Sequence, residues 1–131
     1  MVVGVDGSEP NREATRRAAL EAIAHNARLD VVHAWNFLDQ PGPTFDPHYG
    51  EDAARARIET FLDDVLDGNR PPDVEIHLVN DHAARALVDA SDGAFTLVVG
   101  ARGLGGFKGI LLGSVSQHLV HHATCPVLIV R

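Results

Sequence analysis

The sequence predicts an α/β fold in which one parallel sheet of five strands carries helices on both faces. Two observations lead to this prediction. Five short apolar runs of strand length alternate along the chain with four segments whose apolar residues recur at helical spacing. Strands that alternate with helices form parallel sheets, and the connections between them are right-handed crossovers. We therefore expect residues 1–131 to form a single domain.

Composition agrees with a compact folded domain. The chain has 131 residues, of which 45% are hydrophobic and 22% are charged, as is typical of globular proteins with a sizeable core. A formal net charge of −7 argues against a nucleic-acid partner, and no apolar run reaches the roughly 20 residues of a membrane helix. A single cysteine, Cys125, and the lack of a signal-peptide pattern lead us to expect a cytoplasmic protein.

The first half of the chain begins with a strand, a helix and a second strand. We expect the first strand over residues 2–5, a helix from Glu9 behind an N-cap at Ser8, and the second strand over residues 29–35. Pro10 fits the first turn of the helix, where its missing N–H would be unpaired anyway. Residues at helical spacing, with small alanines that allow a close approach to the sheet, are Ala14, Ala18, Leu20, Ala22 and Ile23.

The second strand alternates between two faces of the predicted sheet. Val32 and Ala34 point to one face, and Val31, His33 and Trp35 point to the other. His33 is close to the expected ligand crevice, but as a strand residue we interpret it as a packing residue.

The remaining elements follow a long predicted loop. Residues 36–50 contain three prolines and are interpreted as a loop, of a length typical of lids or partly disordered segments. A helix is expected from Glu51 to the residue before Gly68. The later elements are expected over residues 74–79 (strand), 83–90 (helix, capped by Asp81), 95–99 (strand), 114–122 (helix) and 126–130 (strand).

A glycine-rich segment joins the fourth strand to the last helix. Its glycines are Gly100, Gly103, Gly105, Gly106, Gly109 and Gly113. Glycine lets another group approach the backbone closely, and a helix N-terminus presents unpaired N–H groups with the positive end of its dipole. Arg102 and Lys108 add cationic side chains. The segment therefore predicts an anion site, most often a phosphate site, against the alternative of a merely mobile surface loop.

The spacing of these glycines resembles a known signature. Gly100, Gly103 and Gly113-Ser114 follow the pattern Gly, two residues, Gly, nine residues, Gly-Ser, which is similar to the ATP-binding signature of the universal stress protein (Usp) family. The Walker A and dinucleotide patterns do not fit. Short runs at residues 5–8, 31–34 and 125–130 also fall where that family places them, so the resemblance covers the whole chain. It implies a Rossmann-like fold with strand order 3-2-1-4-5 and an ATP-binding function.

That strand order would make the first and fourth strands neighbours, and their carboxyl ends the switch point where open α/β sheets bind ligands. We expect the phosphates to meet backbone N–H groups at the glycine-rich segment, assisted by two hydroxyls. The residues concerned are Gly103, Gly113, Ser114, Val115 and Ser116. Alternatively, Ser114 forms a capping box with Gln117.

The same crevice is expected to hold the adenosine part of the nucleotide. The resemblance implies that Asp6 accepts a hydrogen bond from a ribose hydroxyl or the adenine amine, the alternative being that Asp6 caps the helix after the first strand. An adenine slot needs flat apolar walls of small residues. The expected wall residues are Gly4 and Val5 (through their backbone), Ala34, Val99 and Gly100.

Three functions are compatible with this site: a regulator that binds ATP, a slow ATPase or nucleotide-transfer enzyme, and an interaction module with an empty site. No catalytic residue is evident, because the acids that could approach the phosphates are limited to Asp6, Asp39 and Asp46. We expect the regulator, with ATP accompanied by Mg²⁺, at most weak hydrolysis and no metal held by a dedicated set of protein ligands. An apolar fifth strand at the sheet edge predicts a homodimer through that strand.

Three further features are interpreted without a function. His118, His121 and His122 lie close together on the last helix, and two of them at one-turn spacing could bind zinc, but a solvated helix end is the interpretation we prefer. Residues 80–83 depart from the glycine and proline that many family members carry there. The sequence leaves open whether the chain is a whole gene product or half of a tandem protein.

Overall fold

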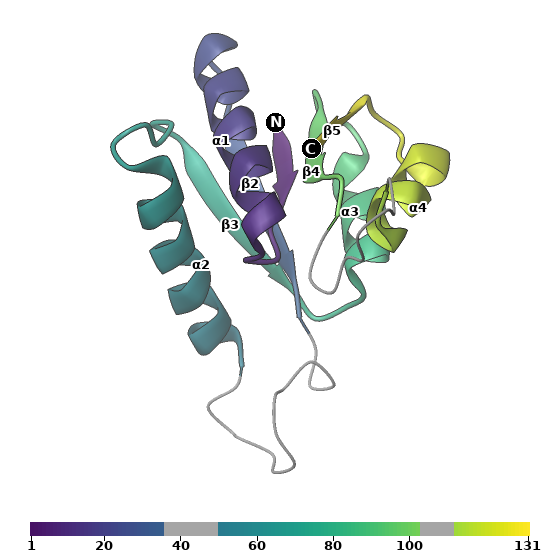
Figure 1. Cartoon of the computed structure of the whole chain (residues 1–131), viewed down its shortest axis with the longest axis horizontal. Helices are drawn as coiled ribbons and strands as arrows, with labels where there is room; N and C mark the ends of the chain where they lie inside the picture. Colours follow the sequence, from purple (N-terminus) through teal and green to yellow (C-terminus); the bar gives the residue numbers. More distant parts are fainter. Residues whose placement is uncertain (36–49, 103–111) are drawn as a thin grey trace.

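The computed structural model describes residues 1–35, 50–102 and 112–131. In these ranges strands alternate with helices, as expected from the sequence. In chain order the elements are β1 (Val2–Gly4), α1 (Glu9–Ala24), β2 (Leu29–Ala34), α2 (Glu51–Leu66), β3 (Val74–Val79), α3 (Ala83–Ser91), β4 (Leu97–Gly100), α4 (Ser114–His122) and β5 (Val127–Val130). Figure 1 shows α1 and α2 on one side of the sheet and α3 and α4 on the other.

The five strands form one parallel sheet in the order β3-β2-β1-β4-β5, so the predicted fold class and strand order are confirmed. β1 lies in the centre, where Val3 pairs with Val31 of β2 and with Val98 of β4. The chain winds outward in opposite directions from β1 and β4. Their carboxyl ends are therefore the topological switch point of the sheet.

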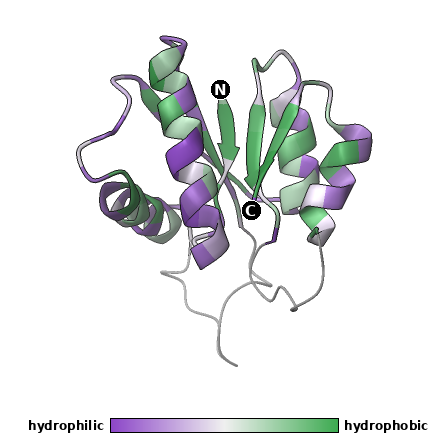
Figure 2. Ribbon diagram, turned by 45° about the horizontal axis from the view of Figure 1, so that its top comes forward, coloured by the Kyte–Doolittle hydropathy of each residue, from purple (hydrophilic) through white to green (hydrophobic). Residues whose placement is uncertain are grey.

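Two apolar cores pack against the two faces of the sheet. Val31 belongs to the core under α1 and α2, and Val32 belongs to the core under α3 and α4, so the predicted alternation in β2 is confirmed. Figure 2 shows the strands as a hydrophobic layer between helices whose outer faces are hydrophilic. Leu62 and Leu119 are fully buried and anchor α2 and α4 to their respective cores.

The alanines of α1 allow this helix to lie close to the sheet. Ala14, Ala18 and Ala22 are completely buried, as predicted from their spacing. Leu20 and Ile23 share the helical period with the alanines but lie on the outer side, where 57% and 46% of their surface is exposed. Small side chains contact the sheet, so the apolar pattern of α1 overstates the width of its buried face.

Element boundaries differ from the prediction at the central strands. β4 begins at Leu97, where its pairing with Val127 starts, whereas Phe95 lies before the strand and is 58% exposed, with its ring 5.0 Å from that of His25. β1 ends at Gly4, although the Val5 N–H still donates to the Val32 carbonyl of β2 at 2.9 Å. Apolar side chains continue beyond the ladder, so the sequence predicts strands that are too long at these ends.

Of the two predicted helix caps, the position of the first is confirmed and the second is wrong. Ser8 is the N-cap of α1, but its hydroxyl donates to the Asp6 carboxylate at 2.6 Å and makes no cap hydrogen bond to the helix. At α3 the N-cap is His82, because Asp81 accepts a hydrogen bond from the His82 N–H at 2.7 Å instead of reaching into the helix. In both places the aspartate stabilises the turn that precedes the helix.

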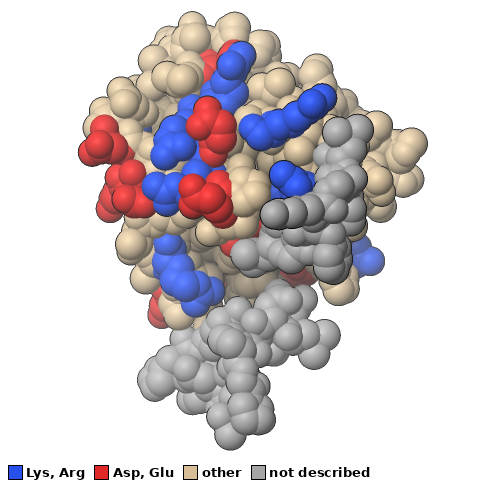
Figure 3. Space-filling view, viewed as in Figure 1, with Lys and Arg blue, Asp and Glu red and all other residues tan. Residues whose placement is uncertain are grey.

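Charged side chains alternate in sign on the face of the molecule that carries α1 and α2, as Figure 3 shows. Arg12 pairs with Asp64 at 2.7 Å, and Arg70 pairs with Glu59 at 3.1 Å. The described residues on this face therefore present no continuous stretch of positive charge. Among the described residues, no helix has the length and hydropathy to cross a membrane.

Candidate functional site

The residues predicted for the ligand site come from three segments that end at the same edge of the sheet. Asp6 follows β1, Gly100 ends β4, and Gly113 immediately precedes α4. β1 and β4 are neighbours in the sheet, so the first two segments lie side by side although over ninety residues separate them. Gly103 and Lys108, with Asp39 and Asp46 of the long loop, lie outside the described residues.

The two ends of the glycine-rich segment are tied together. The Gly113 N–H donates to the Ala101 carbonyl at 2.6 Å, and the Ala101 N–H donates to the carbonyl of Val130 in β5 at 2.8 Å. The Ser116 hydroxyl is buried and donates to the Gly100 carbonyl at 2.7 Å. These bonds fix the start of α4 against the end of β4, so the helix N-terminus has a defined position at the sheet edge.

The N-terminus of α4 has the features of an anion site. Gly113 is its N-cap, in an extended conformation, and makes no side-chain hydrogen bond to the helix. The predicted capping box of Ser114 with Gln117 is therefore wrong, because Ser114 is the first helical residue and its side chain is exposed. The first N–H groups of a helix have no partner within it and carry the positive end of its dipole. Here no side chain of the helix satisfies them.

Ser116 has a different role in the structure from the predicted one. Its hydroxyl donates to the Gly100 carbonyl and is 3.3 Å from the Ala101 carbonyl. A hydroxyl has one hydrogen to donate. Ser116 therefore stabilises the junction of β4 and α4, whereas the exposed Ser114 is the hydroxyl that solvent and ligands can reach.

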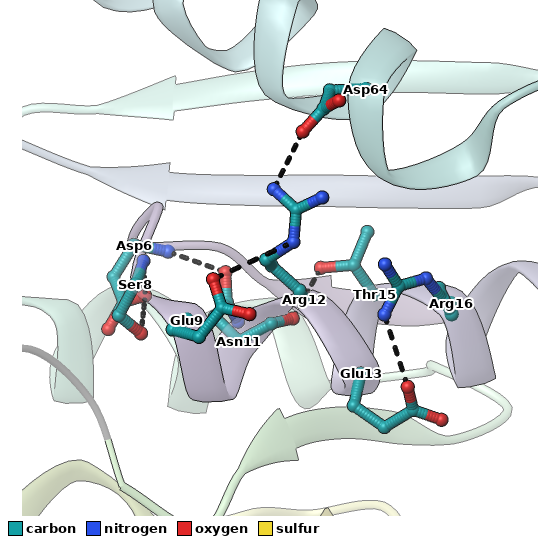
Figure 4. A network of polar contacts seen from close by, with 9 residues as sticks. All are labelled: Asp6, Ser8, Glu9, Asn11, Arg12, Glu13, Thr15, Arg16 and Asp64. Carbon is teal, nitrogen blue, oxygen red and sulfur yellow. Dashed lines mark hydrogen bonds and ion pairs between the residues drawn. The ribbon is translucent and has the colours of Figure 1, made fainter.

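The turn between β1 and α1 is held by a polar network that the sequence pattern did not predict. Asn11 is 4% exposed; its amide donates to the Gly4 carbonyl at 2.7 Å and accepts from the Asp6 N–H at 3.0 Å. The Asp6 carboxylate accepts from the Ser8 N–H at 2.8 Å and from the Ser8 hydroxyl at 2.6 Å. Figure 4 shows this network around the first turn of α1. Asp6 therefore stabilises this turn, as in the alternative interpretation of the sequence, and its ligand role stays a prediction.

A signal for Asn11 was present in the sequence. Asn11 falls on the same helical face as the buried Ala14, Ala18 and Ala22. A buried polar side chain on such a face requires hydrogen-bond partners. The backbone groups at the end of β1 are the nearest groups that need them.

Two glycines predicted to line the site have packing roles. A Cβ on Gly4 would lie 2.9 Å from the Leu87 Cδ1, so the absence of a side chain there allows α3 to approach β1. A Cβ on Gly100 would lie 3.2 Å from the Arg102 carbonyl oxygen and 3.4 Å from the Pro10 carbonyl oxygen, so a side chain there would be crowded mainly by the backbone that follows β4. Packing is therefore an alternative explanation for these glycines, and their role in ligand approach stays a prediction.

The expected adenine walls lie on both sides of the sheet edge. Ala34 and Val99 pack with the core under α3 and α4, and Val99 is 4% exposed. Val5 is equally buried in the core under α1 and α2. The Nδ1 atom of His33 lies 2.8 Å from the Val5 carbonyl and, since a carbonyl accepts, carries the proton of this bond. His33 is thus half-buried and hydrogen-bonded to the backbone at the end of β1.

The single cysteine, Cys125, does not have the features of a catalytic thiol. Burial raises the pKa of the Cys125 thiol, which disfavours the reactive thiolate. On α4 the rings of His118 and His122 have centroids 4.3 Å apart and stack at a tilt of 33°. Among the described residues, no third ligand group joins these imidazoles, and zinc sites usually have at least three protein ligands.

Comparison with known proteins places this arrangement in a family. The model of the "Universal stress protein family" matches residues 1–131. The chain is 38% identical to the universal stress protein Rv2005c of Mycobacterium tuberculosis, covering 100% of this chain and 45% of that protein. It is 36% identical to the "Universal stress protein in QAH/OAS sulfhydrylase 3'region" of Thermus aquaticus, covering 100% of this chain and 97% of that protein.

A solved structure is similar along almost the whole chain. It is described as a "universal stress protein in complex with cAMP", is 32% identical, covers 99% of this chain and 94% of its own, and superposes with a TM-score of 0.74. Fold and site together define a doubly wound α/β protein with a glycine-rich segment at its switch point. The chain belongs to the universal stress protein family. It spans 45% of the length of its mycobacterial relative.

Proposed function

We propose that this protein binds ATP at the carboxyl edge of the sheet and acts as a regulator through binding rather than turnover. The observation that carries the proposal is the N-terminus of α4, which is fixed to β4 through Gly113 and Ser116 and is not capped by a side chain of its own helix. A polyphosphate would satisfy the N–H groups of Ser114 and Val115 and meet the exposed Ser114 hydroxyl.

The comparison supports an adenine nucleotide as the ligand class. The neighbour described in complex with cAMP is 32% identical over nearly the full chain. cAMP and ATP share adenine, ribose and a phosphate, so a related site would hold the adenosine part in the same way. In this proposal Asp6 contacts the ribose or the adenine amine, and the backbone of Gly4 and Val5, with Ala34, Val99 and Gly100, borders the base.

Mg²⁺ would accompany the phosphates without a dedicated protein site. The Oδ1 atom of Asp6 already accepts two hydrogen bonds from Ser8. Mg²⁺ keeps several waters and binds readily to phosphate oxygens. We therefore assign the ion to the nucleotide and to water.

We also propose that residues 1–131 form one nucleotide-binding domain and that the protein acts in the cytoplasm.

Hydrolysis of ATP is expected to be slow. Phosphoryl transfer needs a group that orients the attacking water, and the described residues at this edge offer Asp6, whose Oδ1 holds the turn. In single-turnover experiments with labelled ATP and Mg²⁺ we expect a rate far below the roughly 1–100 s⁻¹ of kinases, and release of intact ATP. A rate near one per second that collapses in Asp6→Asn while binding persists would make the protein an enzyme. Asparagine retains the acceptor for Ser8, so this variant should fold.

We also propose a homodimer through β5. This strand is an edge of the sheet, and its residues are only half-buried. The Pro126 and Val130 carbonyls face β4, so in the alternating backbone of the strand the N–H groups of Val127 and Ile129 face outward. An apolar strand with outward-facing backbone groups favours pairing with a second copy.

Proline at an outward position tests this dimer. Ile129→Pro removes one outward donor and should convert a dimer to a monomer in sedimentation velocity at micromolar concentration. Leu128→Pro is the matched comparison, since it removes a donor that faces β4 and should lower stability instead. A wild-type protein that sediments as a monomer at these concentrations excludes the dimer.

A further inference from the structure

We propose that the β2–β3 edge of the sheet contains a binding site for a divalent transition-metal ion of the zinc type, with Asp30, Glu75 and His77 as ligands. Asp30 and Glu75 are near the amino ends of these strands, whereas the nucleotide is proposed at the carboxyl ends of the strands. The sequence pattern assigned no metal to this region.

Strand register brings the three ligands together. Asp30 is the partner of Glu75, and Val32 is the partner of His77, so Asp30, Glu75 and His77 share the face of the sheet that also carries Val32. One oxygen or nitrogen atom from each ligand lies within 4.8 Å of the others, and the Asp30 Oδ1 is 2.9 Å from the His77 Nε2. Zinc bonds of about 2.0–2.2 Å separate tetrahedral ligand atoms by roughly 3.3–3.6 Å. Small side-chain rotations are therefore sufficient.

The ligand types select the class of metal. Mg²⁺ and Ca²⁺ prefer oxygen ligands alone, whereas an imidazole with two carboxylates suits Zn²⁺ and neighbouring transition metals. All three side chains stand on paired strands, which position ligands more rigidly than loops do. Water would complete the coordination, because the site borders an open cavity.

That cavity is lined by three carboxylates and by two residues that carry a cation, Arg28 and Met1, whose cation is the N-terminal ammonium group. Its volume is about 610 Å³, and its charged or titratable lining side chains are Arg28, Asp30, His77, Asp89 and Asp92. The described residues form no ion pair with Asp89 or Asp92. Glu75, the other carboxylate of the proposed site, is exposed. A dication near these groups would reduce their mutual repulsion.

In the structure the Arg28 guanidinium lies beside the carboxylates that would bind the metal ion. Its Nε atom is 2.9 Å from the Asp30 Oδ1, and its Nη1 atom is 3.4 Å from Glu75. The Arg28 side chain is 51% exposed, so it can turn into solvent when a metal binds. Arg28 is therefore a competitor of the metal.

Zn²⁺ titration of the intact protein tests the site. We expect one equivalent of Zn²⁺ to shift the backbone amide NMR signals of residues 28–31 and 74–78. His77→Gln keeps a donor for the Asp30 carboxylate but removes the imidazole, and should weaken Zn²⁺ binding by at least about tenfold in calorimetry. Arg28→Gln removes the competing charge and should tighten it. His122→Ala, a matched change in the imidazole pair of α4, should leave the affinity unchanged.

The alternatives give different results. Shifts confined to residues 118–122, or an affinity that His77→Gln does not change, would place any zinc on α4 and overturn the proposal. Weaker Zn²⁺ binding by Arg28→Gln would also overturn the proposal. If Zn²⁺ takes the place of the Arg28 guanidinium, removing that charge cannot weaken Zn²⁺ binding. Circular dichroism of each variant confirms that the fold is retained before the titrations are compared.

Discussion

Gly113→Val is expected to weaken the binding of an ATP analogue by at least a hundredfold. Gly113 precedes the N-terminus of α4, where we place the phosphates, and a branched side chain there would keep them from the first N–H groups of the helix. Losing two charge-assisted hydrogen bonds costs about 1.5–3 kcal/mol each, which corresponds to at least about a hundredfold in affinity. Titration with a fluorescent ATP analogue measures the change.

The structure provides a matched control for this variant. Gly113 has φ −74° and ψ 170°, a conformation that valine adopts readily, so the variant should fold. Gly50 is the N-cap of α2 and also has an extended backbone, and a Cβ at this position would meet no other atom within 4 Å. Gly50→Val should leave the affinity unchanged. Equal affinities of wild type and folded Gly113→Val would remove the N-terminus of α4 from the site.

Asn11→Ala is expected to lower the free energy of unfolding by about 2–4 kcal/mol, since each buried polar group left without a partner costs about 1–3 kcal/mol. The groups that lose their partner are the Gly4 carbonyl and the Asp6 N–H. Because the same bonds set the turn that carries Asp6, nucleotide affinity should fall as well. Urea unfolding followed by circular dichroism gives the stability change.

Asn69→Ala is the appropriate comparison for the buried asparagine. Asn69 is exposed, so the same chemical change there should alter the free energy of unfolding by less than about 0.5 kcal/mol. If both variants are equally stable, the Asn11 network does not hold the β1–α1 turn, and the position of Asp6 needs another explanation.

Periodicity was sufficient to predict the elements and the fold class, but not the strand order. The apolar runs and the alanine face of α1 predict the elements, and the family resemblance implies the strand order that the sheet has. Strand ends were less predictable. Phe95 is apolar, but it lies before the start of the β4–β5 ladder, and pairing with a distant strand cannot be read from local composition.

The sequence predicted which segments meet at the candidate site. It did not predict the hydrogen bonds and contacts that single residues make there. Ser8, Asp81 and Ser114 are all good N-cap residues by type. Ser8 does lie at the N-cap of α1, but its side chain makes no cap hydrogen bond. The N-caps of α3 and α4 are the neighbouring residues His82 and Gly113. Gly4 and Gly100 satisfy a ligand pattern, but a side chain at these positions would also crowd Leu87 and the Arg102 carbonyl, respectively. Such contacts depend on how helices pack across the sheet, which the sequence does not display locally.

Native mass spectrometry with ATP and Mg²⁺ tests the central claim most directly, because it reports bound nucleotide and oligomeric state together. We expect one intact ATP per chain, retained by the wild-type protein and by Gly50→Val and lost from Gly113→Val. A wild-type chain that carries no nucleotide at saturating ATP, or that carries the same amount in Gly113→Val, would contradict the assignment of ATP to the N-terminus of α4.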